Sequence, residues 1–357
     1  MVKLSDAFDL QMGKTPARAN DAYWNDGSNQ WVSIADLSRF GKYVDDTKET
    51  ITDLAVSESG IKVVPADTVI MSFKLSIGKT AIAKNPVYTN EAIMAFIPNG
   101  KYEIDTNYLY HMLSSRDWSK GTNRAVMGAT LNKATLGEIE IHIPPIAEQL
   151  EIAEILDKVD ELIANRNGQL DHLDMLVKSR FIELFHDKNF PVFKWNDVFN
   201  TTTGKLDANA MVADGAYPFF TCAKEVYRID KYAFDQEALL LAGNNAAGKY
   251  DVKYYKGKFN AYQRTYVLSL KQAWSYQLFR YQLEDKLTYL QEQSKGSNTR
   301  YITLKILSDL EFVVPPMDLQ NEFAAFVEHT DKLKLAVTEA LAELETLKKS
   351  LMQQYFG

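Results

Sequence analysis

The chain has 357 residues, of which 46% are hydrophobic and 24% charged, with one cysteine and a formal net charge of −7. This length is enough for two domains with full hydrophobic cores, and no apolar run approaches the roughly 20 residues that a membrane span needs. The single cysteine, Cys222, excludes an internal disulfide and favours a cytoplasmic location.

The acidic excess is unevenly distributed along the chain. Residues 146–190 carry 10 acidic and 5 basic residues, and residues 315–357 carry 7 and 4. Residues 191–314, in contrast, carry 16 basic and 13 acidic residues. The negative net charge therefore does not exclude nucleic-acid binding, because phosphate contacts depend on the local supply of Lys and Arg.

The sequence repeats itself once. The residues around Pro144 align with those around Pro315 at a constant offset of 171, and the agreement continues without a gap for roughly fifty residues. The pairs Gly13-Lys14 and Gly204-Lys205 align at an offset of 191. The first repeat therefore holds about twenty extra residues, and the chain is predicted to contain two copies of one structural unit.

The first globule is predicted over residues 1–143. It ends in the alternating apolar pattern of a strand, with Ile139, Ile141 and Ile143 on one face. Its basic and polar segments are candidates for DNA contact, although an ordinary solvated surface is the favoured interpretation here. The candidate residues are Lys74, Lys79, Lys120, Asn123 and Arg124.

A long helix is predicted over residues 144–188, because Pro144-Pro145 stops the strand and suits the first turn of a helix. Its apolar residues alternate at spacings of four and three, the seam of a coiled coil. We expect residues 165–168 to bend or fray this helix. The seam residues are Ile152, Leu156, Val159, Ile163, Leu170, Leu173, Val177 and Leu184, interrupted by Arg166 and Arg180.

The second globule is predicted over residues 189–314 and holds the strongest candidates for DNA contact. Lys and Arg suit phosphates, and Asn, Gln and Arg can bind base edges bidentately. A β-hairpin edge kept soluble by its lysines fits the same composition equally well. The candidates are Asn244, Asn245, Lys249, Lys253, Tyr254, Tyr255, Lys256, Lys258, Gln263, Arg264, Ser297, Asn298 and Arg300.

A second long helix is predicted over residues 315–357. We expect an α+β fold of two tandem globules, each followed by a long helix, with the two helices paired as an antiparallel coiled coil about a pseudo-two-fold axis. Helices that pack only on their own globules are the alternative, but the stripe is narrow, which favours one partner helix. The predicted seam is Phe326, Leu333, Val337, Ala340, Leu344, Leu347 and Leu351, interrupted by Thr330.

The sequence lacks a recognisable catalytic motif. Gly13-Lys14-Thr15 and Gly78-Lys79-Thr80 resemble the end of a phosphate-binding loop, but the glycine that should stand five residues earlier is phenylalanine in both. The five histidines are scattered without metal-ligand spacing. We therefore expect a binding protein that is not an enzyme and binds no metal.

These features together resemble the specificity subunit of type I restriction–modification enzymes. The resemblance covers the whole chain and rests on the two Pro-Pro-x-x-x-Gln helix starts at 144–149 and 315–320. The helix ends at Leu184-Phe185 and Tyr355-Phe356, and the segment Gly-Lys-Phe-Asn-Ala-Tyr-Gln-Arg at 257–264, add to it.

The resemblance implies two target-recognition domains, each reading one half of a split, asymmetric DNA sequence. The helices would set the spacing and dock two modification subunits, which would bind S-adenosylmethionine and methylate a flipped adenine. A restriction subunit would join through them, and this chain would bind no cofactor itself. Two alternatives stay open: the recognition subunit of a related two-subunit methylation and cleavage system, and a coiled-coil scaffold without DNA binding.

Overall fold

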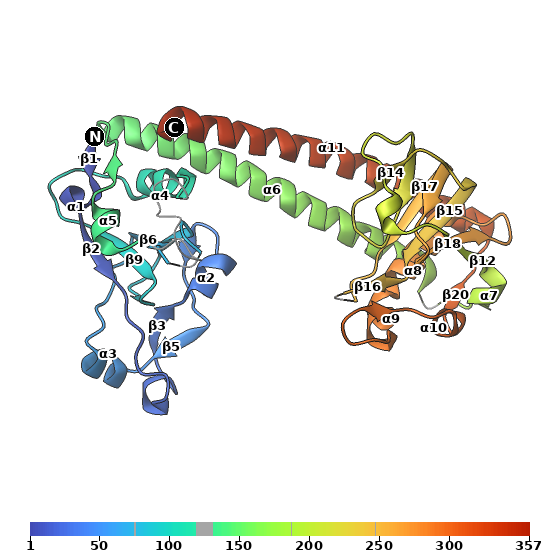
Figure 1. Ribbon diagram of the computed structural model, residues 1–357, viewed down its shortest axis with the longest axis horizontal. Helices are drawn as coiled ribbons and strands as arrows, with labels where there is room; N and C mark the ends of the chain where they lie inside the picture. Colours follow the sequence, from blue (N-terminus) through green and yellow to red (C-terminus); the bar gives the residue numbers. More distant parts are fainter. Residues whose placement is uncertain (75, 119–130, 187, 247) are drawn as a thin grey trace. The chain divides into compact units, whose positions relative to one another are not determined.

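The computed structural model describes residues 1–74, 76–118, 131–186, 188–246 and 248–357. They form two compact units (Figure 1). Unit 1 consists of Met1–Asn167 and Glu339–Gly357, and unit 2 of Gly168–Thr338. Each unit therefore contains one globule together with one half of each long helix.

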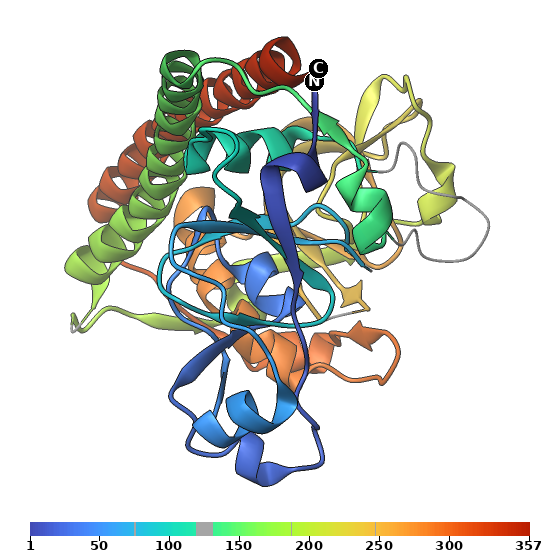
Figure 2. The same cartoon turned by 90° about the vertical axis from the view of Figure 1, so that its left-hand side faces the viewer.

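Unit 1 is built on a five-stranded sheet in the order β2-β9-β6-β7-β4, with β2 at an open edge (Figure 2). Its neighbours are antiparallel except for the parallel pair of β4 and β7. The central strand β6 is buried along its whole length, beneath helix α4 (Thr106–Ser115). The strands are β2 (Phe8–Met12), β4 (Tyr43–Val44), β6 (Thr68–Ser72), β7 (Thr80–Ala83) and β9 (Ile93–Pro98).

Unit 1 also contains a smaller, three-stranded sheet. It has the order β5-β3-β8 and packs Trp31 and Ile51 against Ala55 of helix α3. The guanidinium of Arg18 lies 3.8 Å from the ring centre of Trp24. The elements are η1 (Asp21–Tyr23), β3 (Asn29–Val32), α2 (Ile34–Arg39), β5 (Glu49–Ile51), α3 (Asp53–Ser59) and β8 (Tyr88–Thr89).

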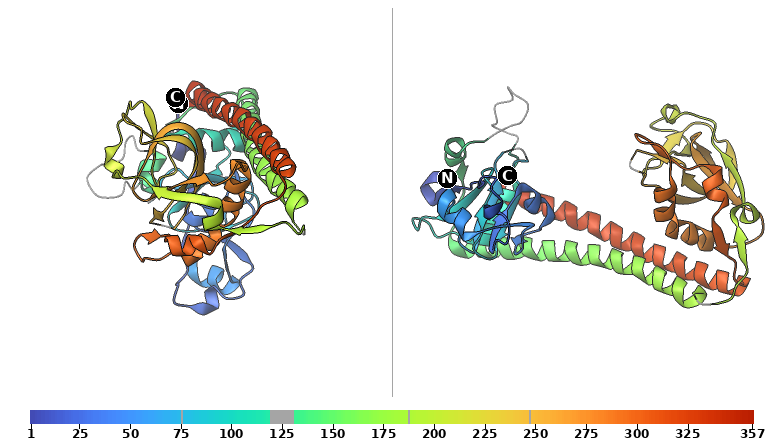
Figure 3. Two further views of the ribbon diagram at one scale, coloured as in Figure 1. Left: turned by 90° about the vertical axis from the view of Figure 1, so that its right-hand side faces the viewer. Right: turned by 90° about the horizontal axis from the view of Figure 1, so that it is seen from below.

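Unit 2 is built on a six-stranded sheet in the order β12-β18-β15-β17-β13-β14 (Figure 3, left). The helices α8 (Tyr276–Asp285) and α9 (Leu287–Gln293) contribute Phe279 and Leu290 to its core. The strands are β12 (Phe199–Thr203), β13 (Tyr217–Phe220), β14 (Tyr227–Ile229), β15 (Phe234–Ala242), β17 (Val252–Ala261) and β18 (Thr265–Leu270).

Each repeat is closed by a short antiparallel strand pair. In unit 1, β1 (Val2–Lys3) pairs with β10 (Glu140–Ile141), directly before the Pro-Pro sequence. In unit 2, β11 (Val192–Lys194) pairs with β20 (Glu311–Val313). The start and the end of each repeat therefore meet. Short helices complete the globules: α1 (Leu4–Ala7), α5 (Lys133–Gly137), α7 (Trp195–Val198), η2 (Ala208–Ala210) and α10 (Leu304–Ser308).

The two long helices are α6 (Ile146–Phe185) and α11 (Met317–Phe356), which confirms the predicted helices after each Pro-Pro sequence. A buried glutamine joins the start of each helix to its globule. In unit 1, Gln149 Nε2 donates to the Pro144 carbonyl at 2.8 Å, and its Oε1 accepts from the Asp105 amide at 2.9 Å. Asp105 is the N-cap of α4.

The same joint recurs in unit 2. Gln320 Nε2 donates to the Pro315 carbonyl at 2.8 Å, and its Oε1 accepts from the amide of Ser275 at 3.0 Å. Ser275 is the N-cap of α8, as Asp105 is the N-cap of α4. A side-chain amide can donate and accept at once, which suits it to tie two backbone segments together inside a core.

The helices pair antiparallel within each unit, as predicted (Figure 3, right). In unit 1, Lys348 forms an ion pair with Asp160 at 2.5 Å. In unit 2, Lys334 pairs with Asp174 at 2.5 Å, fourteen residues along α6 from Asp160 and fourteen back along α11 from Lys348. The residue numbers of the partners rise on one helix and fall on the other, which defines the antiparallel direction.

Two details of the predicted helices differ in the structure. Residues 165–168 do not fray α6, which continues through them, with Asn167 Nδ2 donating to the Ile163 carbonyl at 3.1 Å. Two positions of the predicted α11 seam are also displaced by one residue, because Leu333 and Leu347 are 43% and 46% exposed. The long side chains of the next residues, Lys334 and Lys348, reach the aspartates of α6 instead.

The end of each helix packs into a globular core. In unit 1, the α11 residues Leu351 and Phe356 join the main core, and the Phe356 ring lies 5.5 Å from that of Tyr108. In unit 2, the α6 residues Leu184 and Phe185 pack with Leu278, Phe323 and Val327. The helices therefore contact both each other and the globules, so the alternative of packing on globules alone is wrong.

Candidate nucleic-acid interface

Three of the residues predicted to contact DNA in the second globule are brought together by a short ladder. Strand β16 (Asn244–Asn245) pairs with β19 (Arg300–Tyr301), so that Asn245 stands opposite Arg300. The Arg300 side chain crosses the loop at Gly248, where a Cβ atom would lie 2.9 Å from its Cδ. Gly248 has a φ of +67°, a conformation that favours glycine.

Arg264 lies beside this ladder. The Gly243 amide donates to the Arg264 carbonyl at 2.8 Å, and the Ile302 amide donates to the Gly243 carbonyl at 2.9 Å. The Arg264 side chain is exposed and forms no ion pair within the described part of the chain. We call the surface formed by these residues and their loops the ladder surface. Its residues are Asn244, Asn245, Lys249, Arg264, Ser297, Asn298 and Arg300.

The ladder surface combines donors and acceptors with positive charge. Lys249, Arg264, Ser297 and Asn298 are exposed, and the other members are half-buried. None of these seven residues carries a carboxylate. Such a surface can contact phosphates with its cations and base edges with its amides and guanidinium groups.

Three other predicted contacts are engaged inside unit 2. Lys253 Nζ donates to the Ala223 carbonyl at 2.9 Å and forms an ion pair with Asp251. Tyr254 donates its hydroxyl to Glu237 at 2.7 Å, and burial raises the pKa of that hydroxyl above its usual value. Tyr255 packs on Phe220 with ring centres 5.4 Å apart. These side chains stabilise the sheet.

Lys256 and Lys258 lie elsewhere on the same sheet. In the β15–β17 ladder they stand opposite Glu237 and Asp235, near the start of β15, whereas the ladder surface adjoins its end at Ala242. Lys256 is 72% exposed and forms an ion pair with Glu237 at 3.3 Å. This pair matches the alternative interpretation of an exposed hairpin whose lysines are solvated.

The candidates of the first globule are more dispersed. The Phe73 amide donates to the Ala92 carbonyl, just as the Gly243 amide donates to the Arg264 carbonyl in unit 2. The next residues along the chain, Lys74 and Asn244, therefore occupy equivalent positions. Lys79 Nζ donates to the hydroxyl of Ser38. Lys120, Asn123 and Arg124 lie outside the described residues.

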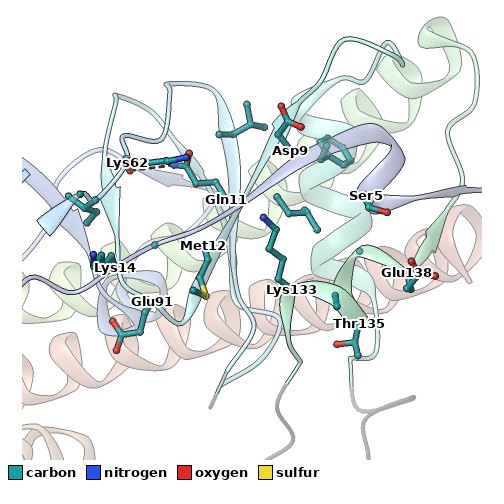
Figure 4. Close-up of a pocket in the computed structure, with 18 residues that line it drawn as sticks. Ser5, Asp9, Gln11, Met12, Lys14, Lys62, Glu91, Lys133, Thr135 and Glu138 are labelled. Carbon is teal, nitrogen blue, oxygen red and sulfur yellow. Dashed lines mark hydrogen bonds between the residues drawn. The ribbon is translucent and has the colours of Figure 1, made fainter.

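Unit 1 has a groove of about 1390 Å³ along the open edge of β2 (Figure 4). Lys14 and Glu91 lie together at one end of it, and Lys133, Thr135 and Glu138 at the other. Gln11 lines it between these two ends, and its Nε2 donates to the Val63 carbonyl at 2.9 Å. The charged residues of both signs that line it leave no net preference for a polyanion along its whole length.

The two Gly-Lys pairs are not among the residues that the sequence predicted to contact DNA. Gly13-Lys14 ends β2 and Gly204-Lys205 ends β12, and both lysines are exposed. Gly13-Lys14 was interpreted as part of an incomplete phosphate-binding loop, and Gly204-Lys205 only as the pair that aligns with it in the second repeat. The signal that could have found them is their recurrence at the same place in both repeats.

In the described ranges we find no group of three or more His, Cys, Asp or Glu side chains placed to hold a metal ion. Over the same ranges, none of the helices combines the length and apolar character needed to cross a membrane. What the described residues do assemble is therefore a polar, partly basic surface on a repeated scaffold.

The fold is shared with specificity subunits of restriction systems. The crystal structure of the type I restriction–modification system S subunit from M. genitalium matches 99% of this chain and 95% of its own, with a TM-score of 0.64 and 16% sequence identity. At that identity the likeness establishes the architecture of two globules and two long helices.

The sequence itself defines the family. The model of the type I restriction modification DNA specificity domain matches residues 1–174 and 187–346, one match for each repeat, and the chain belongs to this family. The specificity subunit of the type I restriction enzyme EcoDI from Escherichia coli is 41% identical over 158 residues. That of MjaIX from Methanocaldococcus jannaschii is 32% identical over 196 residues.

The alignments with these two relatives are partial. They cover 43% and 54% of this chain, and 33% and 44% of the relatives. The chain therefore matches less than half of the length of either protein.

Proposed function

We propose that the chain supplies the DNA sequence specificity of a type I restriction–modification enzyme. Each unit binds one half of a split sequence, and because Lys74 and Ala92 of unit 1 stand where unit 2 has Asn244 and Arg264, the two halves differ. The observation that carries the proposal is the ladder surface on a duplicated scaffold. A duplicated recognition fold is the geometry that suits two half-sites.

The chain acts without catalysis of its own in this proposal. Its partners are duplex DNA and two modification subunits, which bind S-adenosylmethionine and methylate adenine, and a restriction subunit that joins through them. The adenine must leave the base stack for its amino group to be reached. The proposal places the complex in the cytoplasm.

A pair of exposed leucines in each unit supports docking of a partner on the helices. In unit 1, Leu162 and Leu347 are 37% and 46% exposed. They lie two residues after Asp160 and one residue before Lys348, the ion pair that joins the helices. Both therefore flank the same stretch of the helix seam.

Unit 2 contains the equivalent pair, Leu176 and Leu333, which are 49% and 43% exposed and lie beside the ion pair of Asp174 and Lys334. Apolar side chains that recur in the same setting on both units suit two copies of the same partner. We therefore assign these leucines to the docking of the two modification subunits.

Methylation mapping tests the proposed function. DNA is compared from cells that contain the modification subunit with this chain, and from cells that contain the modification subunit alone. The expected result is methyladenine at one split, asymmetric sequence only when the chain is present. Methylation that is absent from both samples, although the proteins co-purify, would favour a scaffold without DNA binding.

A further inference from the structure

The two units share a corner at the end of their first sheet strand. A Cβ atom on Gly13, at the end of β2, would lie 2.1 Å from the Thr89 carbonyl oxygen. On Gly204, at the end of β12, it would lie 1.8 Å from the Ala261 carbonyl oxygen. Only glycine allows so close an approach. The strand end is thus pressed against the segment that precedes β9 in one unit and β18 in the other.

That segment is the same four-residue turn in both units. The Ile93 amide donates to the Asn90 carbonyl at 3.0 Å, and the Thr265 amide donates to the Tyr262 carbonyl at 2.8 Å. The strands that follow also share their register, since Ile93 pairs with Ser72 and Thr265 with Ala242. Glu91 therefore corresponds to Gln263, and Ala92 to Arg264.

The second residue of each turn is held by the loop that follows the Gly-Lys pair. In unit 1, Glu91 accepts a hydrogen bond from the Thr15 hydroxyl and another from Asn90 Nδ2, the latter at 2.9 Å. In unit 2, Gln263 Nε2 donates to Asp207 Oδ1 at 2.8 Å. Glu91 and Gln263 are both exposed. They are held in place while remaining accessible.

Each corner has a lysine at the same position, whereas the turn residues differ between the two units. Lys14 and Lys205 are both exposed, and Lys14 Nζ donates to the Ser59 carbonyl, which leaves two of its three N–H groups free to donate elsewhere. Figure 4 shows Lys14 beside Glu91 at the end of the groove. A lysine that is the same in both units, beside a polar residue that differs between them, matches the division between phosphate contacts and base contacts.

We propose that each half-site is bound at this corner, with Lys14 and Lys205 on equivalent phosphates and the turn residues Glu91, Gln263 and Arg264 on base edges. The proposal rests on the proposed function and names the residues that perform it. Groups that are the same in both units serve what both half-sites share, the phosphate backbone. Groups that differ serve what distinguishes the two half-sites.

The hydrogen-bonding groups of the turn residues determine which bases they can contact. The Glu91 carboxylate can only accept hydrogen bonds, so its partner is a base with an exposed amino group in the major groove, and cytosine N4 fits best. Arg264 can only donate, and a guanidinium pairs bidentately with the O6 and N7 atoms of guanine. The first half-site is therefore expected to require a cytosine and the second a guanine.

Binding as a function of salt tests the phosphate contacts. Full-length chain in complex with its modification subunit is titrated with duplexes that do and do not contain the methylated sequence. Lys14→Ala and Lys205→Ala should each reduce the slope of log affinity against log salt by about 0.9 on both duplexes. Lys14→Arg should restore it. Lys101→Ala, beyond the opposite end of β9, is the matched control and should not change it.

Methylation mapping of the variants tests the base contacts. Glu91→Gln should relax the base preference in one half-site only, and Arg264→Ala in the other only. Unchanged salt slopes for both lysine variants, or an altered methylation sequence for either of them, would overturn the assignment. If the wild-type complex methylates a split sequence and these variants do not differ from it, this inference fails and the proposed function stands. If the wild-type complex methylates no split sequence, the proposed function itself has failed.

Discussion

The glutamine at the start of α6 offers a direct measurement of how firmly the long helices are fixed to the globules. Gln149 is fully buried and makes three hydrogen bonds, at 2.8 Å to the Pro144 carbonyl, 3.0 Å to the Glu103 carbonyl and 2.9 Å from the Asp105 amide. At about 1 kcal/mol for each bond, Gln149→Ala should lower the stability of unit 1 by about 3 kcal/mol. The equivalent change in unit 2, Gln320→Ala, removes two such bonds and should cost about 2 kcal/mol.

Amide hydrogen exchange resolves the two units, whereas a single unfolding curve would merge them. Because 1.4 kcal/mol corresponds to a tenfold change, the Asp105 amide should exchange about a hundredfold faster in the Gln149→Ala variant. The Ser275 amide should exchange about thirtyfold faster in Gln320→Ala. Gln354→Ala, at an exposed position near the end of α11, is the control. Equal exchange at both amides in all three variants would refute the reasoning.

Three further changes have expected outcomes. The double variant Leu176→Ser, Leu333→Ser should leave the helices folded but remove one of the two modification subunits from the complex, as counted by native mass spectrometry. Leu335→Ser, at a position that is 61% exposed, is the control. A double variant that still binds two modification subunits would contradict the docking assignment. Burial lowers the pKa of His111, so the unfolded chain takes up the proton first and the free energy of unfolding should fall as the pH drops below about 6.5. Thermal melts between about pH 7.5 and 5.5 should show a smaller loss of stability for His111→Gln than for the wild-type chain. An equal loss in both would show that His111 is not the cause. Gly204→Ala should destabilise unit 2 by about 1–3 kcal/mol in urea unfolding, because the new Cβ would lie 1.8 Å from a carbonyl oxygen; wild-type stability would show that the corner can relax.

Local patterns were sufficient to predict the long helices and their direction. Pro-Pro cannot continue the preceding strand and suits the first turn of a helix, and an internal repeat carries the same information twice. The register of α11 was not predictable in this way. A rule that places leucine inside cannot anticipate that Lys334 and Lys348 take the seam positions, because their carboxylate partners belong to the other helix and lie more than a hundred residues away.

The candidate site shows the same limit. Composition selects Lys253 and Arg264 alike, yet Lys253 is held by Asp251 and a backbone carbonyl while Arg264 is exposed. Asn245 and Arg300 are adjacent only because β16 pairs with β19, a contact between segments 55 residues apart. Which polar residues share a surface depends on strand pairing, and strand pairing cannot be predicted from one local segment because it joins segments that are distant in the sequence.

The packing of Phe356 against Tyr108 has a consequence for biosynthesis. Unit 2 is one continuous segment, whereas unit 1 consists of two, and Leu351 and Phe356 of its second segment pack against its core. Domains usually finish folding in the order in which the ribosome makes them. Here the globule that emerges first gains this contact only after α11 has been made, so a nascent chain stalled before Leu351 leaves the Tyr108 side of its core uncovered.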